Sequence, residues 1–233
     1  MKFGLIGDGY ATQFHRKAIA SIGGTVEAVY DPKYLGSIDM LSFWEYFKYD
    51  YIVICSPTHL HREHIQEALK RDYEVIVEKP MCLPWEPIID DDRINVVMQL
   101  RWLPQPKKVK NVKIVKVRDK NYFSSWKGDA TKTGGLFYNL FIHYIDLALL
   151  HRATFEGMVL DKGIQKFSIN GIDIASPYMQ EAFNSMYRDI LLGKGVKPKD
   201  LYYLYWILEK KSNIYGYGKR SLNRKIVIER NLK

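Results

Sequence analysis

Two side chains of this chain suit proton transfer, one at the end of a strand and one on a helix. Lys79 stands in the run Glu78-Lys79-Pro80, directly after residues 73–77, an apolar stretch typical of a buried parallel strand. An amine at such a strand end is partly desolvated, so it can donate to a substrate hydroxyl or carbonyl and take part in proton transfer. The alternative is a lysine that only reaches solvent.

The second side chain belongs to a polar stripe on an otherwise apolar helix predicted over residues 134–151. Asn139, His143 and Asp146 stand at i, i+4 and i+7, so they share one side of this helix. Buried polar groups need partners, so the stripe faces either a site or an internal network. A histidine titrates near neutral pH, which suits acid–base chemistry, and Asp146 can orient its ring from one turn away. The alternative for His143 is a hydrogen-bonded core histidine.

Cations with neighbouring tryptophans indicate an anionic substrate. Arg101 and Trp102 end the last strand of the first half, and Trp126 and Lys127 lie in a loop before the long helix. This combination suits an anionic, ring-bearing molecule such as a sugar nucleotide. The alternative is a surface loop with no ligand.

The first residues predict a dinucleotide site. An apolar run at residues 2–6 breaks into Gly7-Asp8-Gly9-Tyr10-Ala11-Thr12, and a helical pattern follows. Glycines let the backbone turn tightly and approach a pyrophosphate, whose charge the helix N-terminus favours. A second strand ends in Asp31, where a carboxylate would bind the ribose hydroxyls and repel a 2′-phosphate, which favours NAD over NADP. The alternative is an ordinary glycine turn and a turn-forming Asp-Pro pair.

Polar residues also follow the third predicted strand, residues 51–55. Ser56, Pro57 and Thr58 stand at its carboxyl end, which faces the ligand crevice of a parallel sheet. His61 and His64 lie three residues apart on the next helix, but no third ligand is evident, so we expect no metal.

Strands and helices alternate through the first hundred residues, which predicts a Rossmann-type parallel sheet. A crossover helix between Pro80 and Arg93 must be short or missing, because this stretch holds three prolines. After Arg101 the pattern predicts an α+β domain with a reduced, mostly antiparallel open sheet, including a hairpin of 155–160 with 164–174. A helix capped by Ser176 and Pro177 follows. We expect domains at residues 1–103 and 104–233.

The composition excludes several classes of protein. The chain has 233 residues, 47% apolar and 26% charged, as in an ordinary globular protein. Without a membrane-length apolar run or a signal-peptide pattern, we expect a cytoplasmic protein with no membrane partner. Cys55 and Cys82 are expected to be reduced thiols. The net charge of +9 is densest at residues 107–120, as on the solvent face of a strand, and no nucleic-acid motif accompanies it.

Together these motifs resemble the Gfo/Idh/MocA family of NAD(P)-dependent oxidoreductases, in shortened form. The pieces that carry the resemblance occur in family order: Gly7 to Thr12, Cys55-Ser56-Pro57-Thr58-His59-Leu60-His61, Glu78-Lys79-Pro80, and Gly134-Gly135 leading to His143 and Asp146. Residues 99–101, 125–129 and Asn139 resemble the UDP-N-acetylglucosaminuronate 3-dehydrogenases, which act in the synthesis of surface polysaccharides.

The resemblance implies a role for each matching residue. Lys79 and His143 would be catalytic, and the Lys79–Pro80 bond would be cis. The residues implied to bind NAD are Gly7, Gly9, Tyr10, Ala11, Thr12, Asp31, Ser56, Pro57, Thr58, His61, Glu78, Lys79 and Arg101. Those implied to bind the substrate are Lys79, Arg101, Trp126, Lys127, Asn139 and His143.

The resemblance therefore predicts an NAD-dependent dehydrogenase that oxidises a ring hydroxyl, at position 3, of an anionic UDP-sugar. It implies a homo-oligomer, a dimer or tetramer formed through the C-terminal sheet. Thr58 and Asn139 depart from the Asn and Asp of many members, and the chain is shorter than usual. Two alternatives stay open: another small-molecule reductase on this fold, of small-sugar or biliverdin type, and a non-catalytic descendant that binds NAD or a sugar nucleotide.

Overall fold

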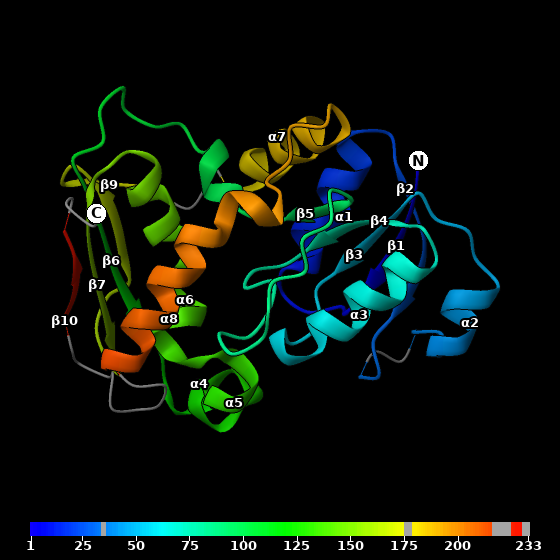
Figure 1. Ribbon diagram of the computed structural model, residues 1–233, viewed down its shortest axis with the longest axis horizontal. Coiled ribbons are helices and arrows are strands. Elements are labelled where there is room, and N and C mark those ends of the chain that lie inside the picture. Colours follow the sequence, from blue (N-terminus) through cyan, green and yellow to red (C-terminus); the bar gives the residue numbers. More distant parts are fainter. Residues whose placement is uncertain (34–35, 175–178, 216–224, 230–233) are drawn as a thin grey trace. The chain divides into compact units, whose positions relative to one another are not determined.

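The computed structural model describes residues 1–33, 36–174, 179–215 and 225–229 (Figure 1). The chain forms two compact units, each built from several segments. Unit 1 comprises Met1–Cys82, Pro87–Trp102 and Met179–Leu201, and unit 2 comprises Leu83–Glu86, Leu103–Tyr178 and Tyr202–Lys233. The expected domains at 1–103 and 104–233 stay a prediction, and the caps Ser176 and Pro177 lie outside the described residues.

Unit 1 contains a parallel sheet of five strands, as the alternating pattern predicted. The strands are β1 (Lys2–Ile6), β2 (Thr25–Tyr30), β3 (Tyr51–Ile54), β4 (Glu74–Val77) and β5 (Ile94–Val96), in the order β2-β1-β3-β4-β5. Their residues are largely buried and apolar, which is typical of a parallel sheet covered on both faces. The carboxyl ends of β1, β3 and β4 therefore lie side by side.

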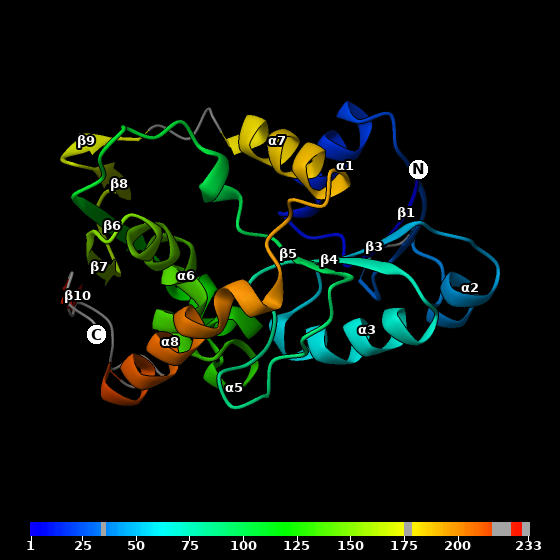
Figure 2. The same cartoon turned by 45° about the horizontal axis from the view of Figure 1, so that its top comes forward.

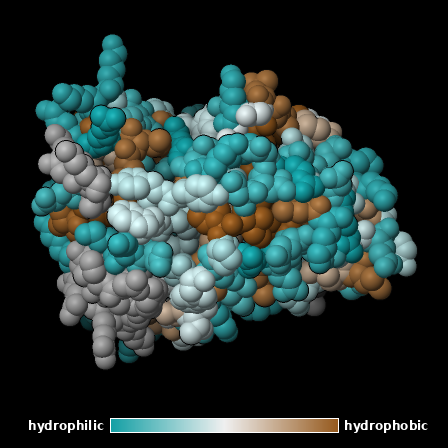
Figure 3. Space-filling view, in the orientation of Figure 1, coloured by the Kyte–Doolittle hydropathy of each residue, from teal (hydrophilic) through white to brown (hydrophobic). Residues whose placement is uncertain are grey.

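The helices of unit 1 are α1 (Thr12–Ser21), α2 (Met40–Glu45), α3 (Thr58–Lys70), η1 (Gln99–Trp102), α7 (Met179–Leu191) and η4 (Pro198–Leu201). Helices α1 and α7 cover one face of the sheet and α3 covers the other (Figure 2). The outward side of α3 is mostly hydrophilic in Figure 3. No helix lies between β4 and β5, so the predicted loss of that crossover helix is confirmed.

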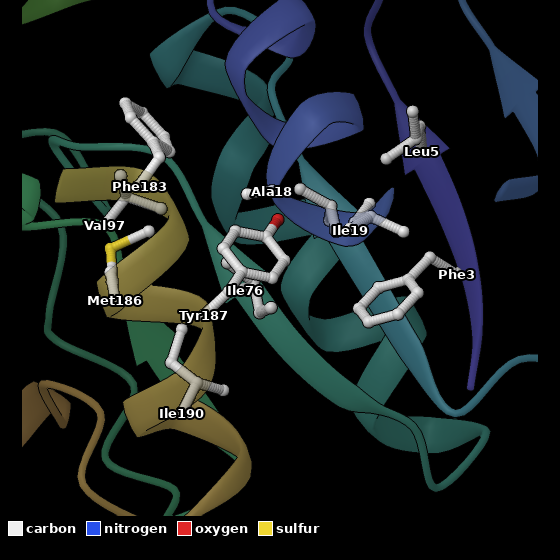
Figure 4. Packing of buried hydrophobic residues seen from close by; sticks show 11 residues of the cluster. Phe3, Leu5, Ala18, Ile19, Ile76, Val97, Phe183, Met186, Tyr187 and Ile190 are labelled. Carbon is white, nitrogen blue, oxygen red and sulfur yellow. The ribbon is translucent and has the colours of Figure 1, made fainter. Parts of the chain in front are cut away.

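One apolar core holds α1 and α7 against the sheet. Phe3 and Leu5 of β1 meet Ala18 and Ile19 of α1, and α7 adds a row of buried side chains (Figure 4). The side chains from α7 are Phe183, Met186, Tyr187 and Ile190. Their spacing of three and four residues gives a helix one apolar side, so a segment far along the chain completes the first core.

Unit 2 contains a second sheet of five strands in the order β10-β7-β6-β8-β9. These strands are β6 (Asn111–Val117), β7 (Thr154–Leu160), β8 (Lys166–Ile169), β9 (Ile172–Asp173) and β10 (Lys225–Ile228). Among the described strands of this sheet, only β6 and β7 pair in parallel, so the predicted mostly antiparallel sheet is confirmed.

The predicted hairpin of residues 155–160 with 164–174 is wrong. Strand β6 lies between β7 and β8, and β8 instead forms a short hairpin with β9. The helix between β6 and β7 makes a crossover that places β7 parallel on one edge of β6, which leaves β8 the other edge. The β8–β9 turn uses Asn170 and Gly171 at φ of 53° and 82°, as tight hairpins require.

The helices of unit 2 are α4 (Lys120–Ser124), η2 (Trp126–Gly128), α5 (Ala130–Thr133), α6 (Gly135–Leu150) and α8 (Tyr202–Tyr215). Helix α6 packs against β6 and β7, and α8 packs against α6. The long helix predicted over 134–151 is confirmed, but residues 126–128 form a 3₁₀ helix where a loop was expected. Among the described helices, none combines the length and apolarity needed to cross a bilayer.

Candidate functional site

The first glycine turn is built for close backbone approach. Gly7 has a φ of +94°, and a Cβ there would lie 2.7 Å from the carbonyl carbon of Cys55. A side chain at this position is thus excluded by both conformation and space. Gly9 differs, because a Cβ there would meet nothing within 4 Å. Thr12, at the position of the usual third glycine, closes the turn by donating its hydroxyl to the Gly7 carbonyl at 3.0 Å.

Asp31 at the end of β2 is connected to the same turn. Its carboxylate accepts hydrogen bonds from the backbone N–H of Asp8 at 2.7 Å and of Lys33 at 2.8 Å. The carboxylate of Asp8 in turn pairs with Arg16 at 3.1 Å. The acid expected at the ribose therefore lies at the strand end and next to the glycine turn. Its side chain is only partly buried.

The loop after β3 is fixed by two histidines of α3. Ser56 and Thr58 are buried, and Pro57 forms the N-terminal boundary of this helix. The Ser56 hydroxyl lies 2.9 Å from Nδ1 of His64, and the pKa of His64 is lowered by burial to about 4. His61 lies between two carbonyls, with Nε2 2.7 Å from the Ser56 oxygen and Nδ1 2.8 Å from the Pro80 oxygen.

Because burial also lowers the pKa of His61, this ring is neutral near pH 7 and donates to one of its two carbonyls. The ring therefore packs between the loops that follow β3 and β4 and hydrogen-bonds to one of them, the choice depending on its tautomer. Within the described ranges, no group of three or more His, Cys, Asp or Glu side chains is placed to hold a metal ion. The role of His61 in binding NAD stays a prediction.

The Glu78-Lys79-Pro80 run follows β4. The Lys79–Pro80 peptide bond is cis, as the resemblance implied. One carboxylate oxygen of Glu78 accepts the backbone N–H of Lys79 at 3.2 Å, which fixes the residue that carries the amine. Glu78 keeps 13% of its side chain exposed, Lys79 is half-buried and Pro80 is buried, so the run is only partly accessible.

Unit 1 thus brings together the residues predicted after three strands. Gly7 packs on the Cys55–Ser56 backbone, and His61 joins Ser56 to Pro80. These contacts place the ends of β1, β3 and β4 at one edge of the sheet, where ligands of open parallel sheets bind. Arg101 lies in η1 of the same unit. The next residue, Trp102, donates a hydrogen bond from Nε1 to the carboxylate of Asp189 on α7 at 2.8 Å.

Sequence reasoning missed two side chains that touch this edge, His15 of α1 and Tyr187 of α7. The His15 ring is fully buried, with Nε2 3.1 Å from Glu78 and Nδ1 2.6 Å from the Tyr187 hydroxyl. The signal was the position of His15 four residues after Ala11 and four before Ile19, on the apolar side of the helix pattern.

Unit 2 holds the other predicted residues on α6. His143 and Asp146 are buried at 7% and 3% exposure, as the polar stripe indicated. Asn139 donates from Nδ2 to the Tyr122 hydroxyl at 3.2 Å, a partner on α4 that the sequence did not indicate. Burial raises the pKa of Tyr122, so this hydroxyl stays protonated at neutral pH.

Trp126 and Lys127 lie on η2 of unit 2, with Trp126 half-buried and Lys127 exposed. Since Lys79 and Arg101 belong to unit 1 and His143 to unit 2, their convergence on one substrate stays a prediction.

A comparison with models of protein families finds a match that lies mainly in unit 1. Residues 1–90 match the model described as the GFO_IDH_MocA oxidoreductase family with an NAD-binding Rossmann fold. The resemblance is thereby confirmed over these residues, which include β1 to β4 of the parallel sheet.

Solved structures of similar fold cover most of the chain. The WlbA (WbpB) dehydrogenase from Thermus thermophilus, in complex with NAD and UDP-GlcNAcA, matches at 22% identity and a TM-score of 0.75, over 90% of this chain and 94% of that one. The WlbA dehydrogenase from Bordetella pertussis, with NADH and UDP-GlcNAcA, matches at 16% identity and 0.66, over 98% and 97%. A myo-inositol dehydrogenase from Corynebacterium glutamicum matches at 14% and 0.66, over 98% and 99%. At these identities the likeness concerns the fold.

Proposed function

We propose that this chain, whose residues 1–90 match the NAD-binding oxidoreductase family, is an NAD-dependent dehydrogenase of a UDP-sugar. The reaction oxidises a ring hydroxyl, at position 3 of a substrate such as UDP-N-acetylglucosaminuronate, in surface polysaccharide or glycan synthesis. The observation that carries the proposal is the convergence of Gly7, Ser56 and Lys79-Pro80 at one edge of the parallel sheet. The UDP-GlcNAcA bound in the two WlbA structures supports the substrate class.

The residues of this edge fit NAD. Gly7 leaves no room for a side chain, whereas the open space at Gly9 leaves room for a ligand beside the start of α1. That helix start has no side-chain cap and no acidic residue in its first turn, so its N–H groups and positive dipole can receive a pyrophosphate. The Asp31 carboxylate lies next to this turn and can bind ribose hydroxyls.

In this function bound NAD supplies the hydride acceptor. Lys79 would hold or accept the proton of the substrate hydroxyl through its Nζ atom, since its backbone is fixed by Glu78 at the strand end. His143 would be the second proton-transfer group, with Asp146 on the same side of α6 to orient it.

The remaining roles concern the anionic substrate. Arg101 and Lys127 would neutralise its charges, Trp126 would stack on a ring, and Asn139 would donate to the sugar. These four side chains come from η1, η2 and α6, so the proposal predicts that both units contribute to substrate affinity.

The proposal is tested by the appearance of NADH absorbance when the purified chain is mixed with NAD and UDP-N-acetylglucosaminuronate. We expect turnover with this substrate, and a much lower kcat/KM with UDP-N-acetylglucosamine, which lacks the carboxylate. Binding of NADH, seen as a rise in Tm, without any turnover would favour the non-catalytic descendant. A lack of binding of both NADH and NADPH would contradict the function.

A second candidate is a dehydrogenase of a small polyol. The likeness in fold to myo-inositol dehydrogenase favours including it in the same experiment. Turnover of myo-inositol, with UDP neither binding nor inhibiting, would replace the UDP-sugar by a neutral substrate.

The homo-oligomer remains part of the proposal. The second sheet carries a cavity of about 400 Å³ on the side of β6, β7 and β10 that bears Lys113, Glu156 and Val227. Glu156 pairs with Lys113 at 3.5 Å and with Lys225 at 2.9 Å, so this surface is polar. Light scattering should give the mass of a dimer or tetramer, and neutralising Glu156 should lower it if this face is the interface.

A further inference from the structure

One buried titratable side chain takes no direct part in the proposed reaction. His15 lies in the middle of α1 with none of its surface exposed, and its ring packs edge-on against Phe183 at 5.0 Å between centroids. A buried imidazole needs a partner for each nitrogen. Both partners of His15 come from other elements, Glu78 from the end of β4 and Tyr187 from α7.

The contacts of Glu78 continue toward the proposed catalytic lysine. One carboxylate oxygen, Oε1, lies 3.1 Å from Nε2 of His15, and the other, Oε2, accepts the Lys79 backbone N–H at 3.2 Å. The series therefore runs Tyr187, His15, Glu78, Lys79, within one compact unit. In Figure 4 the Tyr187 ring extends from α7 toward α1, with its oxygen on that side.

We propose that His15 and Tyr187 are positioning residues for Lys79, acting through Glu78. The Tyr187 hydroxyl sets the orientation of the imidazole, and the imidazole holds and neutralises the carboxylate that fixes the Lys79 backbone. This inference rests on the proposed function, because it assigns Lys79 its proton-transfer role.

The charges around His15 define what its removal does. The groups that face it are Glu78 from β4, Cys55 from the end of β3 and Tyr187 from α7, while Arg16 on its own helix pairs with Asp8. Burial alone lowers the pKa of His15, but Cys55, Tyr187 and Glu78 raise it well above the usual value. Burial raises the pKa of Glu78, and His15 and Lys79 more than offset this and lower it.

Near neutral pH the pair is therefore an imidazolium and a carboxylate, with no net charge beside Lys79. The change His15→Gln keeps a hydrogen-bonding side chain but removes the positive charge, and it leaves the carboxylate uncompensated. A nearby negative charge favours the protonated form of an amine. In this variant Lys79 would accept the hydroxyl proton only at higher pH.

The experiment is the pH dependence of kcat/KM for the wild type, His15→Gln and Tyr187→Phe. For His15→Gln we expect the acidic limb to move to higher pH by about one unit, the lower end of the shifts that a close charge produces. Tyr187→Phe removes one of the groups that raise the pKa of His15 but keeps Glu78 as the counter-charge of the ring, so it should lower kcat several-fold and leave the limb in place. The Kd for NADH should stay within about twofold in both.

Two matched variants separate this role from loss of packing. Phe183→Leu loosens the contact with the His15 ring without changing a charge, so it should lower Tm and leave the limb unchanged. His151→Gln makes the same substitution in unit 2 and should behave as the wild type. In the double variant His15→Gln/Glu78→Gln the limb should return toward its wild-type position, because both charges are removed.

A second readout does not depend on turnover. In an NMR titration of the histidine side chains, His15 should lose its proton above pH 6.5, and Glu78→Gln should lower this midpoint. A wild type with turnover whose acidic limb coincides with that of His15→Gln would overturn the positioning role and leave the proposed function intact. A midpoint of His15 that Glu78→Gln does not move would also overturn it. A wild type without turnover on any tested sugar overturns the function, and the role with it.

Discussion

In unit 1 the polar site residues come from the ends of several strands, whereas in unit 2 they come mainly from one helix. In unit 1 the His61 ring lies between the carbonyls of Ser56 and Pro80, which belong to neighbouring loops. In unit 2, Asn139, His143 and Asp146 follow each other along α6, with Tyr122 as a partner from α4.

This difference follows from the two sheets. A parallel sheet aligns the carboxyl ends of its strands, so residues far apart in sequence meet at one edge. The sheet of unit 2 mixes directions and leaves its site residues to a helix that packs on it. We therefore expect changes at the strand ends of unit 1 to alter cofactor binding and the local fold, and changes on α6 to alter substrate affinity.

The change Lys79→Met should give the largest effect. It removes the amine and keeps the length of the side chain, so we expect turnover to fall by about 10²–10⁴-fold, the usual contribution of proton transfer. NADH should still bind, because the backbone contact with Glu78 remains. The control is Lys70→Met at the exposed end of α3. Full activity of Lys79→Met would remove this residue from the mechanism.

The two glycines of the first turn separate fold from ligand within unit 1. Gly7→Ala should lower the free energy of unfolding by about 3 kcal/mol, since it adds a clash to a strained backbone. Gly9→Ala has free space for its methyl group and should leave the stability nearly unchanged, yet weaken NADH binding. Urea denaturation and NADH titration measure both. Equal stability losses would contradict the free space at Gly9, and unchanged NADH binding by Gly9→Ala would show that this space has no significance for the ligand.

Much of unit 1 could be predicted from sequence because its signals are local. Gly7, Asp31, Ser56 and Lys79 each follow an apolar strand pattern, and the parallel order brings such ends together. The sequence could not show in this way that His15 belongs to the site. Its position fits the apolar side of α1 equally well, and its partner Tyr187 lies 172 residues away on a helix whose packing only the structure defines.

The strand order and contacts of unit 2 were harder to predict from the sequence, for a related reason. The alternating pattern of residues 154–160 and 166–169 fits strands in any order, so it could not indicate that β6 lies between β7 and β8. The stripe on α6 was visible because three polar residues interrupt an apolar helix, but the partner of Asn139 depends on where α4 packs.

The buried pair of unit 1 should make stability depend on pH. Because folding raises the pKa of His15, protonation of this ring stabilises the fold. This stabilisation is complete below the unfolded pKa of 6.5 and is lost as the pH rises through the folded pKa. Because folding lowers the pKa of Glu78, its ionised carboxylate stabilises the fold above the unfolded pKa of 4.5, and this stabilisation is lost as the pH falls through the folded pKa. Between pH 4.5 and pH 6.5, the free energy of unfolding of the wild type should therefore be about 2 kcal/mol higher than that of His15→Gln/Glu78→Gln. The difference should be smaller outside this range.

Urea denaturation from pH 4 to about pH 9 measures this difference. Phe183→Leu, which changes only packing around His15, should lower stability by a similar amount at every pH. A pH-independent difference for the double variant would show that the pair is not charged and that unit 1 holds its strand ends by neutral hydrogen bonds alone.

Tyr122→Phe should give the smallest effect and tests unit 2 by itself. It removes the hydroxyl that accepts from Asn139 but keeps the ring beneath the Arg118 guanidinium, 5.1 Å from its centroid. Losing one hydrogen bond should cost about 1 kcal/mol of stability. The freed amide of Asn139 should raise KM for the UDP-sugar a few-fold and leave Kd for NADH unchanged. Tyr203→Phe on the exposed side of α8 is the matched control. A weaker NADH affinity in Tyr122→Phe, with KM unchanged, would mean that α6 serves the cofactor and that the division of labour between the units is wrong.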